Sequence, residues 1–334
     1  MKLFSNFTQK LLAIGLFTQL SSALNSDEIK IDTFNDFKTL MMYFNEPLLN
    51  DASIRDFIII PGSEKGASFE GANNYIMAKK LAEIIGADRS QSGSVDDVDN
   101  VTKIFGKNLE KGRRVMETMA LSGKVNIKNN AKNLQIELLK RLEESNSEKK
   151  TTVLPFGWGG SAPHSIALII EKNDIKANTF NLIVVNAGDG LEYHYARKDP
   201  NEVYPELNHL WIRFENIPKK EIFSDNNWFM YSLISLRDRD LIKDIESVSG
   251  SAKDYFYGTI LNNFANYIII DKNETRLLPS QRSGSCSLSS LTAALLYSTK
   301  DLSTFHKNRV IIGHKMLNQF FINYECDSGI KKLI

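Results

Sequence analysis

The sequence has little cysteine and no long apolar run. Its 334 residues include two cysteines, Cys286 and Cys326, which excludes a disulfide framework but leaves one bridge open. No cysteine or histidine spacing resembles a zinc finger. No stretch approaches the roughly 18 apolar residues that cross a membrane, so no stable membrane span is expected. With a disulfide framework, a zinc finger and a membrane span excluded, the sequence is that of an ordinary globular protein.

An excess of charge of one sign is also missing. Lys and Arg number 41 and Asp and Glu number 40, so the formal net charge is +1 and charge gives no reason to expect nucleic acid as a partner. The glycine-rich stretch at 157–160 lacks the GxxxxGK[ST] pattern and no helix follows it, which argues against a phosphate-binding loop. We find no internal repeat, which excludes a solenoid.

The N-terminus has the order of a secretory signal. Lysines at 2 and 10 precede an apolar run at 11–20, and Ser-Ser-Ala follows at 21–23. This order predicts a signal peptide over residues 1–26 and a secreted protein. The alternative is an amphipathic first helix that packs on the domain.

The two halves of the chain differ in hydrophobic period. Residues 27–150 have the spacing of helices, and the charged stretch 143–150 is the predicted domain boundary. Residues 151–334 alternate between short apolar runs and helical segments. The predicted strands are 151–156, 164–171, 180–186, 192–197, 210–217 and 267–271, and a helix is predicted over 226–245. The fold class is therefore α+β: a helical N-terminal half followed by an antiparallel sheet with flanking helices.

The stretch 277–298 reads as a strand end, a Gly/Ser loop and a helix that begins near Cys286. The free N–H groups and the dipole of a helix start favour a thiolate over a thiol. Gln281 lies five positions earlier and could donate a hydrogen bond to an oxyanion. The alternative is a small buried cysteine at the start of a Ser-rich helix.

The hairpin formed by 164–171 and 180–186 brings a second pair of candidates together. If the hairpin is centred on Ile175, His164 and Asn186 lie opposite each other on one face of the sheet. A side-chain amide can orient the imidazole of a Cys–His pair. Asp189, in the turn that follows, is the rival for this role. Each residue alone also fits a structural role, as does His194 in the next segment.

These residues together are similar to a known family. The pairs and motifs are Gly157-Trp158, His164, Asn186-x-Gly188-x-Gly190, His194 and Gln281-x-Ser283-Gly284-x-Cys286. They resemble a cysteine-peptidase-like domain of effector proteins from intracellular bacteria such as Legionella and chlamydia relatives. The chain order His, Asn or Asp, Gln, Cys also resembles the adenovirus-protease and SUMO-protease superfamily, which includes the YopJ-like effectors.

The resemblance implies a thiol-dependent hydrolase that cleaves a peptide or isopeptide bond, and it implies no metal or organic cofactor. Cys286 would attack, His164 would act as base and then acid, Asn186 or Asp189 would orient the ring, and Gln281 would bind the oxyanion. The substrate would be a protein, such as a host protein or a ubiquitin-like modifier, reached after delivery into a host cell. Two alternatives stay open: an acetyltransferase with the same residues, and a catalytically inactive module that binds a host protein.

Overall fold

The computed structural model describes residues 74–86, 98–121, 127–143, 150–198, 206–238, 240–271, 274, 286–299, 301–312 and 315. Contacts divide the chain into two compact units, residues 61–309 and a unit formed by 1–60 with 310–334. Nearly all described residues belong to the first unit. The predicted signal peptide and Gln281 lie outside the described residues. Among the helices that are described, none is both long and apolar enough to cross a membrane.

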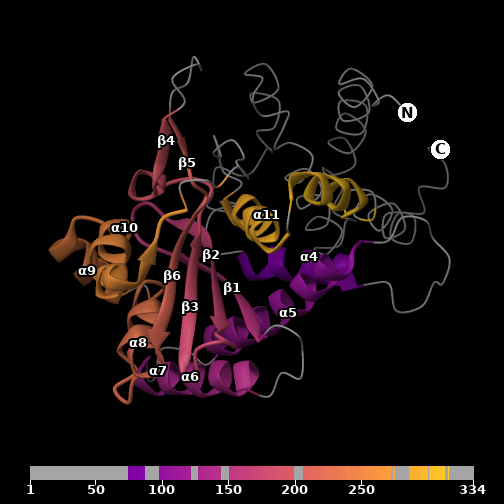
Figure 1. The fold of residues 1–334 in the computed structure, drawn as a ribbon. Coiled ribbons are helices and arrows are strands. Elements are labelled where there is room, and N and C mark those ends of the chain that lie inside the picture. The colour runs from indigo at the N-terminus through magenta and orange to yellow at the C-terminus, as the bar shows by residue number, and fades with distance from the viewer. Residues whose placement is uncertain are drawn as a thin grey trace, which may run out of the picture. The chain divides into compact units, whose positions relative to one another are not determined.

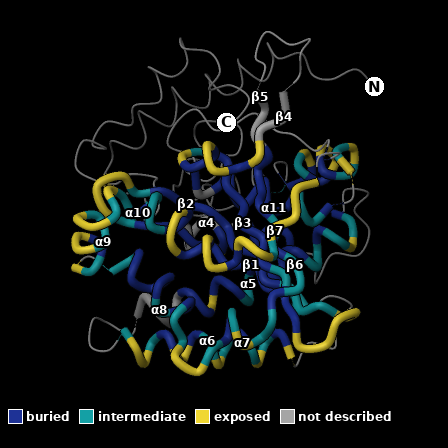
Figure 2. Tube along the Cα trace, turned by 60° about the vertical axis from the view of Figure 1, so that its left-hand side comes forward, coloured by how far each residue is buried: buried dark blue, intermediate teal, exposed yellow. Residues whose placement is uncertain are grey.

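A five-stranded antiparallel sheet forms the centre of the first unit (Figure 1). Its strands, in spatial order, are β1 (Thr151–Trp158), β2 (His164–Lys172), β3 (Thr179–Val185), β6 (Trp211–Pro218) and β7 (Ile268–Ile269). A separate pair is formed by β4 (Ala196–Lys198) and β5 (Glu206–Asn208). The first three strands read as nearly continuous apolar runs because both faces of the sheet are buried (Figure 2). The prediction of a mixed α+β fold with an antiparallel sheet is confirmed.

Helices cover both faces of the sheet. One face packs against α4 (Asn74–Gly86), α5 (Asn100–Leu121) and α11 (Cys286–Ser298). The other shares a core with α6 (Ile127–Glu143), α8 (Trp228–Ser235) and two irregular helical segments, η2 (Tyr255–Ile260) and η3 (Leu261–Tyr267). The shorter helices α7 (Lys219–Ile222), α9 (Leu241–Ser249) and α10 (Ala252–Asp254) complete the described helices of this second layer (Figure 1).

Strand alternation decides which side chains meet which helices. The even-numbered side chains of β2, such as Ile166 and Leu168, belong to the core shared with α6, α8, η2 and η3. The odd-numbered positions face α5 and α11. The polypeptide backbones approach closely there, since a Cβ added at Gly112 of α5 would lie 1.9 Å from the carbonyl oxygen of Val153. Side chains two residues apart in β2 therefore share one environment.

Two predicted elements differ from the structure. The helix predicted over 226–245 is broken into α8 and α9, because the Asp238 carboxylate accepts the N–H groups of Asp240 and Leu241 and restarts the helix. The strand predicted over 192–197 is instead a single 3₁₀ turn, η1 (Leu191–Tyr193), followed by β4. The predicted boundary at 143–150 lies within the range of the compact unit 61–309, in which α5 packs on β1, and a division of the chain there stays a prediction.

Candidate active site

Two predicted site residues meet at the end of the sheet where β2 begins and β3 ends. The observed register pairs Ala167 with Val185, so by extension Asn186 lies opposite Ile166 rather than opposite His164. The predicted register is therefore wrong by two residues. Because the side-chain period of a strand is two, an even shift keeps both side chains on one face. The two are diagonal neighbours, and His164 Nε2 lies 2.9 Å from Asn186 Oδ1.

The register shift originates in the hairpin loop. The prediction counted residues 172–178 as the loop because they are polar. In the structure Lys172 stays in β2 and pairs with Phe180, and the Asn173 N–H still donates to the Thr179 carbonyl at 3.0 Å. The turn is thus shorter and centred one residue later. Asn178 closes it with φ of 57°, a left-handed conformation that asparagine tolerates well.

The orientation of the Asn186 amide is fixed by two backbone groups. Its Oδ1 accepts the Gly188 N–H at 2.9 Å, and its Nδ2 donates to the Asp189 carbonyl oxygen. An N–H can only donate and a carbonyl can only accept, so the two ends of the amide cannot be exchanged. His164 Nε2 therefore carries a hydrogen, which it donates to Asn186 Oδ1. In the neutral ring, Nδ1 of His164 is the unprotonated, basic nitrogen.

A buried chain of side chains continues from the other end of this amide. Asn186 Nδ2 also lies 3.0 Å from the Tyr257 hydroxyl, which lies 3.0 Å from His194 Nε2. His194 Nδ1 lies 2.8 Å from the His209 carbonyl and must donate to it. His194 Nε2 is then an acceptor, so the Tyr257 hydroxyl donates to His194 and accepts from Asn186. These constraints assign the donor and the acceptor in each hydrogen bond between the His209 carbonyl, His194, Tyr257, Asn186 and His164.

The hydrogen-bonded side chains are buried, and His194 and Tyr257 are uncharged at neutral pH. His164 is 5% exposed and Asn186 is fully buried. Burial lowers the pKa of His194 to about 4 and raises that of Tyr257 well above its ordinary value. The Trp158 ring packs against the His164 ring with centroids 5.3 Å apart. The hydrogen bonds therefore act in surroundings of low polarity, where an unmade bond is costly.

The carboxylate of Asp189 is directed elsewhere. Its Oδ1 lies 2.7 Å from Lys253 Nζ, which also contacts Glu192 at 2.7 Å. This ion-pair group is partly exposed. Of the two candidates for the partner of His164, it is Asn186 whose side chain contacts the ring, whereas Asp189 contributes its backbone carbonyl to the Asn186 amide.

Cys286 is the first residue of α11 and is 1% exposed. One turn later, on the same side of the helix, Ser290 Oγ donates to the Ser165 carbonyl at 2.9 Å. Since Ser165 follows His164 directly, the first half of α11 lies beside the start of β2. This helix covers the sheet face opposite the one on which the Trp158 and His164 rings lie. The thiol and the imidazole thus share one end of the sheet, and their direct contact stays a prediction.

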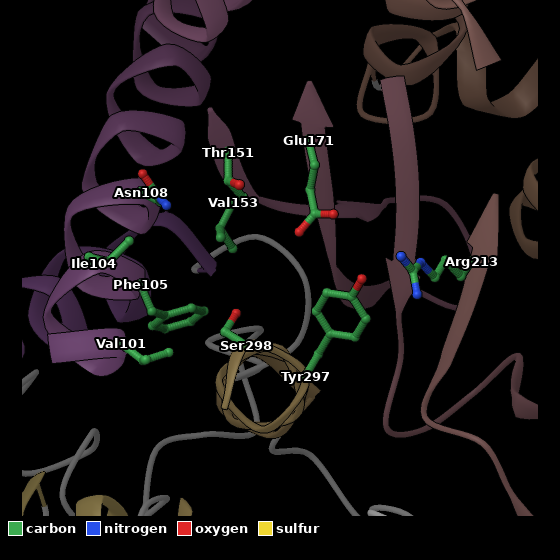
Figure 3. A pocket seen from close by; sticks show the side chains of 10 residues that line it. All are labelled: Val101, Ile104, Phe105, Asn108, Thr151, Val153, Glu171, Arg213, Tyr297 and Ser298. Atoms are coloured by element: carbon green, nitrogen blue, oxygen red, sulfur yellow. The ribbon is translucent and has the colours of Figure 1, made fainter. Parts of the chain in front are cut away.

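A cavity of about 280 Å³ lies on the α5 and α11 face of the sheet (Figure 3), and His164 is not among the residues that line it. Phe105 of α5 and Val153 of β1 form part of its apolar wall, and Glu171, Arg213 and Tyr297 supply polar groups. Glu171 lies near the end of β2, whereas His164 begins this strand. The cavity is therefore separate from the hydrogen-bonded chain.

Of the hydrogen-bonded side chains, Tyr257 was not predicted from the sequence, and His194 was predicted to be structural. Tyr257 carries no local motif and reaches Asn186 across 71 positions of sequence. His194 was judged structural, although its place just after the Asn-x-Gly-x-Gly turn was a usable signal. Within the described ranges, no group of three or more His, Cys, Asp or Glu side chains is arranged to hold a metal ion.

Comparison of the chain with protein-family models, with curated proteins and with solved structures finds no match.

Proposed function

We propose that the protein is a thiol-dependent hydrolase of the cysteine-peptidase type, which cleaves a peptide or isopeptide bond in a protein substrate. In this proposal Cys286 attacks the acyl carbon and His164 accepts the thiol proton at Nδ1. His164 then gives the proton to the leaving amine, and water releases the acyl group from the sulfur. Gln281 is the proposed oxyanion donor. A ubiquitin-like modifier attached to a host protein is the proposed substrate class, reached by secretion.

The observation that carries this proposal is the hydrogen bond from His164 Nε2 to Asn186 Oδ1. A histidine that serves as a base for a neighbouring thiol needs one nitrogen held and the other unprotonated. The Asn186 amide, fixed by backbone groups on both sides, meets the first requirement and dictates the second. Three further groups hold this amide in place, namely the Gly188 N–H, the Asp189 carbonyl and the Tyr257 hydroxyl.

The position of Cys286 gives independent support. The positive end of the dipole of the 13-residue helix α11 favours negative charge on a first-turn sulfur. The Ser290 bond to Ser165 joins this helix to the strand that begins with His164. The nucleophile and the base of the proposal therefore belong to neighbouring elements at one end of the sheet, although α11 covers the face opposite the His164 ring.

The test is alkylation of the full chain by iodoacetamide at pH 7, with both cysteines followed by mass spectrometry. We expect Cys286 to react at least tenfold faster than Cys326 in the folded protein and at a similar rate in urea. His164→Ala should remove the difference, because the base that generates the thiolate is lost. Equal rates for the two cysteines in the folded wild type would contradict a catalytic thiol and favour the binding-module alternative.

Substrate cleavage is tested with a panel of ubiquitin-like modifiers joined to a fluorophore by an amide bond. Wild-type protein should release the fluorophore, and Cys286→Ala should not. Acetyl-CoA consumption without hydrolysis would instead identify the acetyltransferase alternative.

A further inference from the structure

We infer that Tyr257 and His194 are positioning residues of this site, which hold the Asn186 amide in the orientation that leaves His164 Nδ1 basic. The catalytic consequence rests on the proposed function, whereas the orientation itself rests on hydrogen bonds alone. Neither residue contacts the reacting atoms. Both act through Asn186, and they connect the irregular segment η2 and the turn η1 to the end of the sheet.

The direction of the Tyr257 hydroxyl is decided by His194. A hydroxyl can donate or accept, so Tyr257 alone fits either orientation of the amide. His194 Nδ1 uses its hydrogen on the His209 carbonyl at 2.8 Å, which leaves Nε2 as an acceptor. The Tyr257 hydrogen is thereby committed to His194, and its lone pairs face Asn186. The His209 carbonyl therefore favours one orientation of the Asn186 amide, and it acts through His194 and Tyr257.

The packing around Tyr257 leaves its ring no freedom to turn away. Tyr193 stacks on it with centroids 4.6 Å apart and planes at 2°. Trp158 meets its edge at 6.3 Å. Gly190 has φ of 101°, and a Cβ there would lie 2.7 Å from Tyr257 Cε2 and 3.0 Å from Asn186 Nδ2. The absence of a side chain at Gly190 therefore lets the ring and the amide meet.

The reverse orientation of the amide would change the basic nitrogen. Asn186 Nδ2 would then face His164 Nε2, which would have to accept, so the ring hydrogen would move to Nδ1. The nitrogen needed by the thiol would no longer be basic. Gly188 and Asp189 oppose this reversal, and the Tyr257–His194 pair adds a third opposing group. Loss of the pair should therefore weaken the orientation without abolishing it.

The experiment uses the full chain labelled with ¹⁵N at histidine, and reads the tautomer of His164 from two-bond hydrogen–nitrogen correlations at pH 7. Wild type should show the hydrogen on Nε2. Tyr257→Phe keeps the ring and removes the hydroxyl, and we expect mixed tautomers and a fall in kcat of about tenfold with little change in KM. Tyr193→Phe is the matched control and should match wild type. The Tyr193 hydroxyl bonds to Asp254, which is not one of the side chains that link His194, Tyr257 and Asn186.

Two results would overturn the inference. One is a wild-type His164 with its hydrogen on Nδ1. The other is a folded Tyr257→Phe with the wild-type tautomer and unchanged kcat. If Tyr257→Phe fails to fold, His194→Gln is measured in the same way with the same expected change. If wild type cleaves no reporter, the proposed function fails, while the tautomer shift in Tyr257→Phe still decides the positioning role.

Discussion

Replacing His194 with glutamine should remove an acid-sensitive part of the folding free energy. Burial lowers the pKa of His194 from 6.5 to about 4 in the folded protein. Between these two values the unfolded chain binds a proton that the folded chain does not. Stability is therefore complete above pH 6.5 and falls as the pH drops toward 4. The difference between the two pKa values corresponds to about 3 kcal/mol. The groups that face the ring are Tyr257, His209 and the Glu192 carboxylate. Only substitution of His194 removes the group that binds this additional proton in the unfolded chain.

The assay is urea unfolding followed by tryptophan fluorescence at several pH values from 7 to 4. His194→Gln will lower the free energy of unfolding at pH 7, because it breaks the bonds to Tyr257 and His209, so the slope with pH is the informative quantity. Wild type should lose about 3 kcal/mol more than His194→Gln over this window. His306→Gln, at an exposed histidine, is the matched control and should keep the wild-type slope. Parallel curves for wild type and His194→Gln would refute the reasoning.

Three further substitutions test the surroundings of the site. Gly190→Ala should destabilise the protein by roughly 1–3 kcal/mol and lower activity, whereas Gly250→Ala, also at positive φ but with its nearest contact at 3.7 Å, should be milder in both; equal effects would contradict the role of close packing. Ser290→Ala should cost about 1 kcal/mol, and more than Ser298→Ala, whose hydroxyl bonds within its own helix; the reverse order in urea unfolding would argue against the helix–strand link. Lys253→Met should change the free energy of unfolding by less than about 1 kcal/mol, because its ion pairs are partly exposed; a loss above 2 kcal/mol would show that they matter more.

The faces of the strands were predictable, but their register was not. Alternation is a local property, so the sequence places His164 and Asn186 on one face whichever even register is chosen. Register depends on the turn, and here polar Lys172 and Asn173 continue the pairing instead of forming the loop. The pairing of His164 with Asn186 was predicted despite the wrong strand register, because an error of two residues leaves both side chains on the same face.

The hydrogen bonds from Tyr257 and His194 that hold the Asn186 amide could not be predicted from the sequence, for a different reason. Tyr257 lies in η2, a turn of π-helix whose backbone no propensity favours, and its ring reaches Asn186 through tertiary packing. The break between α8 and α9 was within reach, since an aspartate at 238 followed by a further turn is a recognisable helix start. The choice between Asn186 and Asp189 needed the position of Lys253, which the sequence does not give.

The order of these elements along the chain has a consequence during synthesis. The strands that bring His164 and Asn186 together are consecutive in sequence, whereas α11 and its cysteine follow about 100 residues later. At 5–20 residues per second, a ribosome needs roughly 5 to 20 s to cover that distance. The hairpin can therefore pair before the cysteine has been made. A nascent chain can thus hold the His164–Asn186 hydrogen bond before α11 and Cys286 have been synthesised.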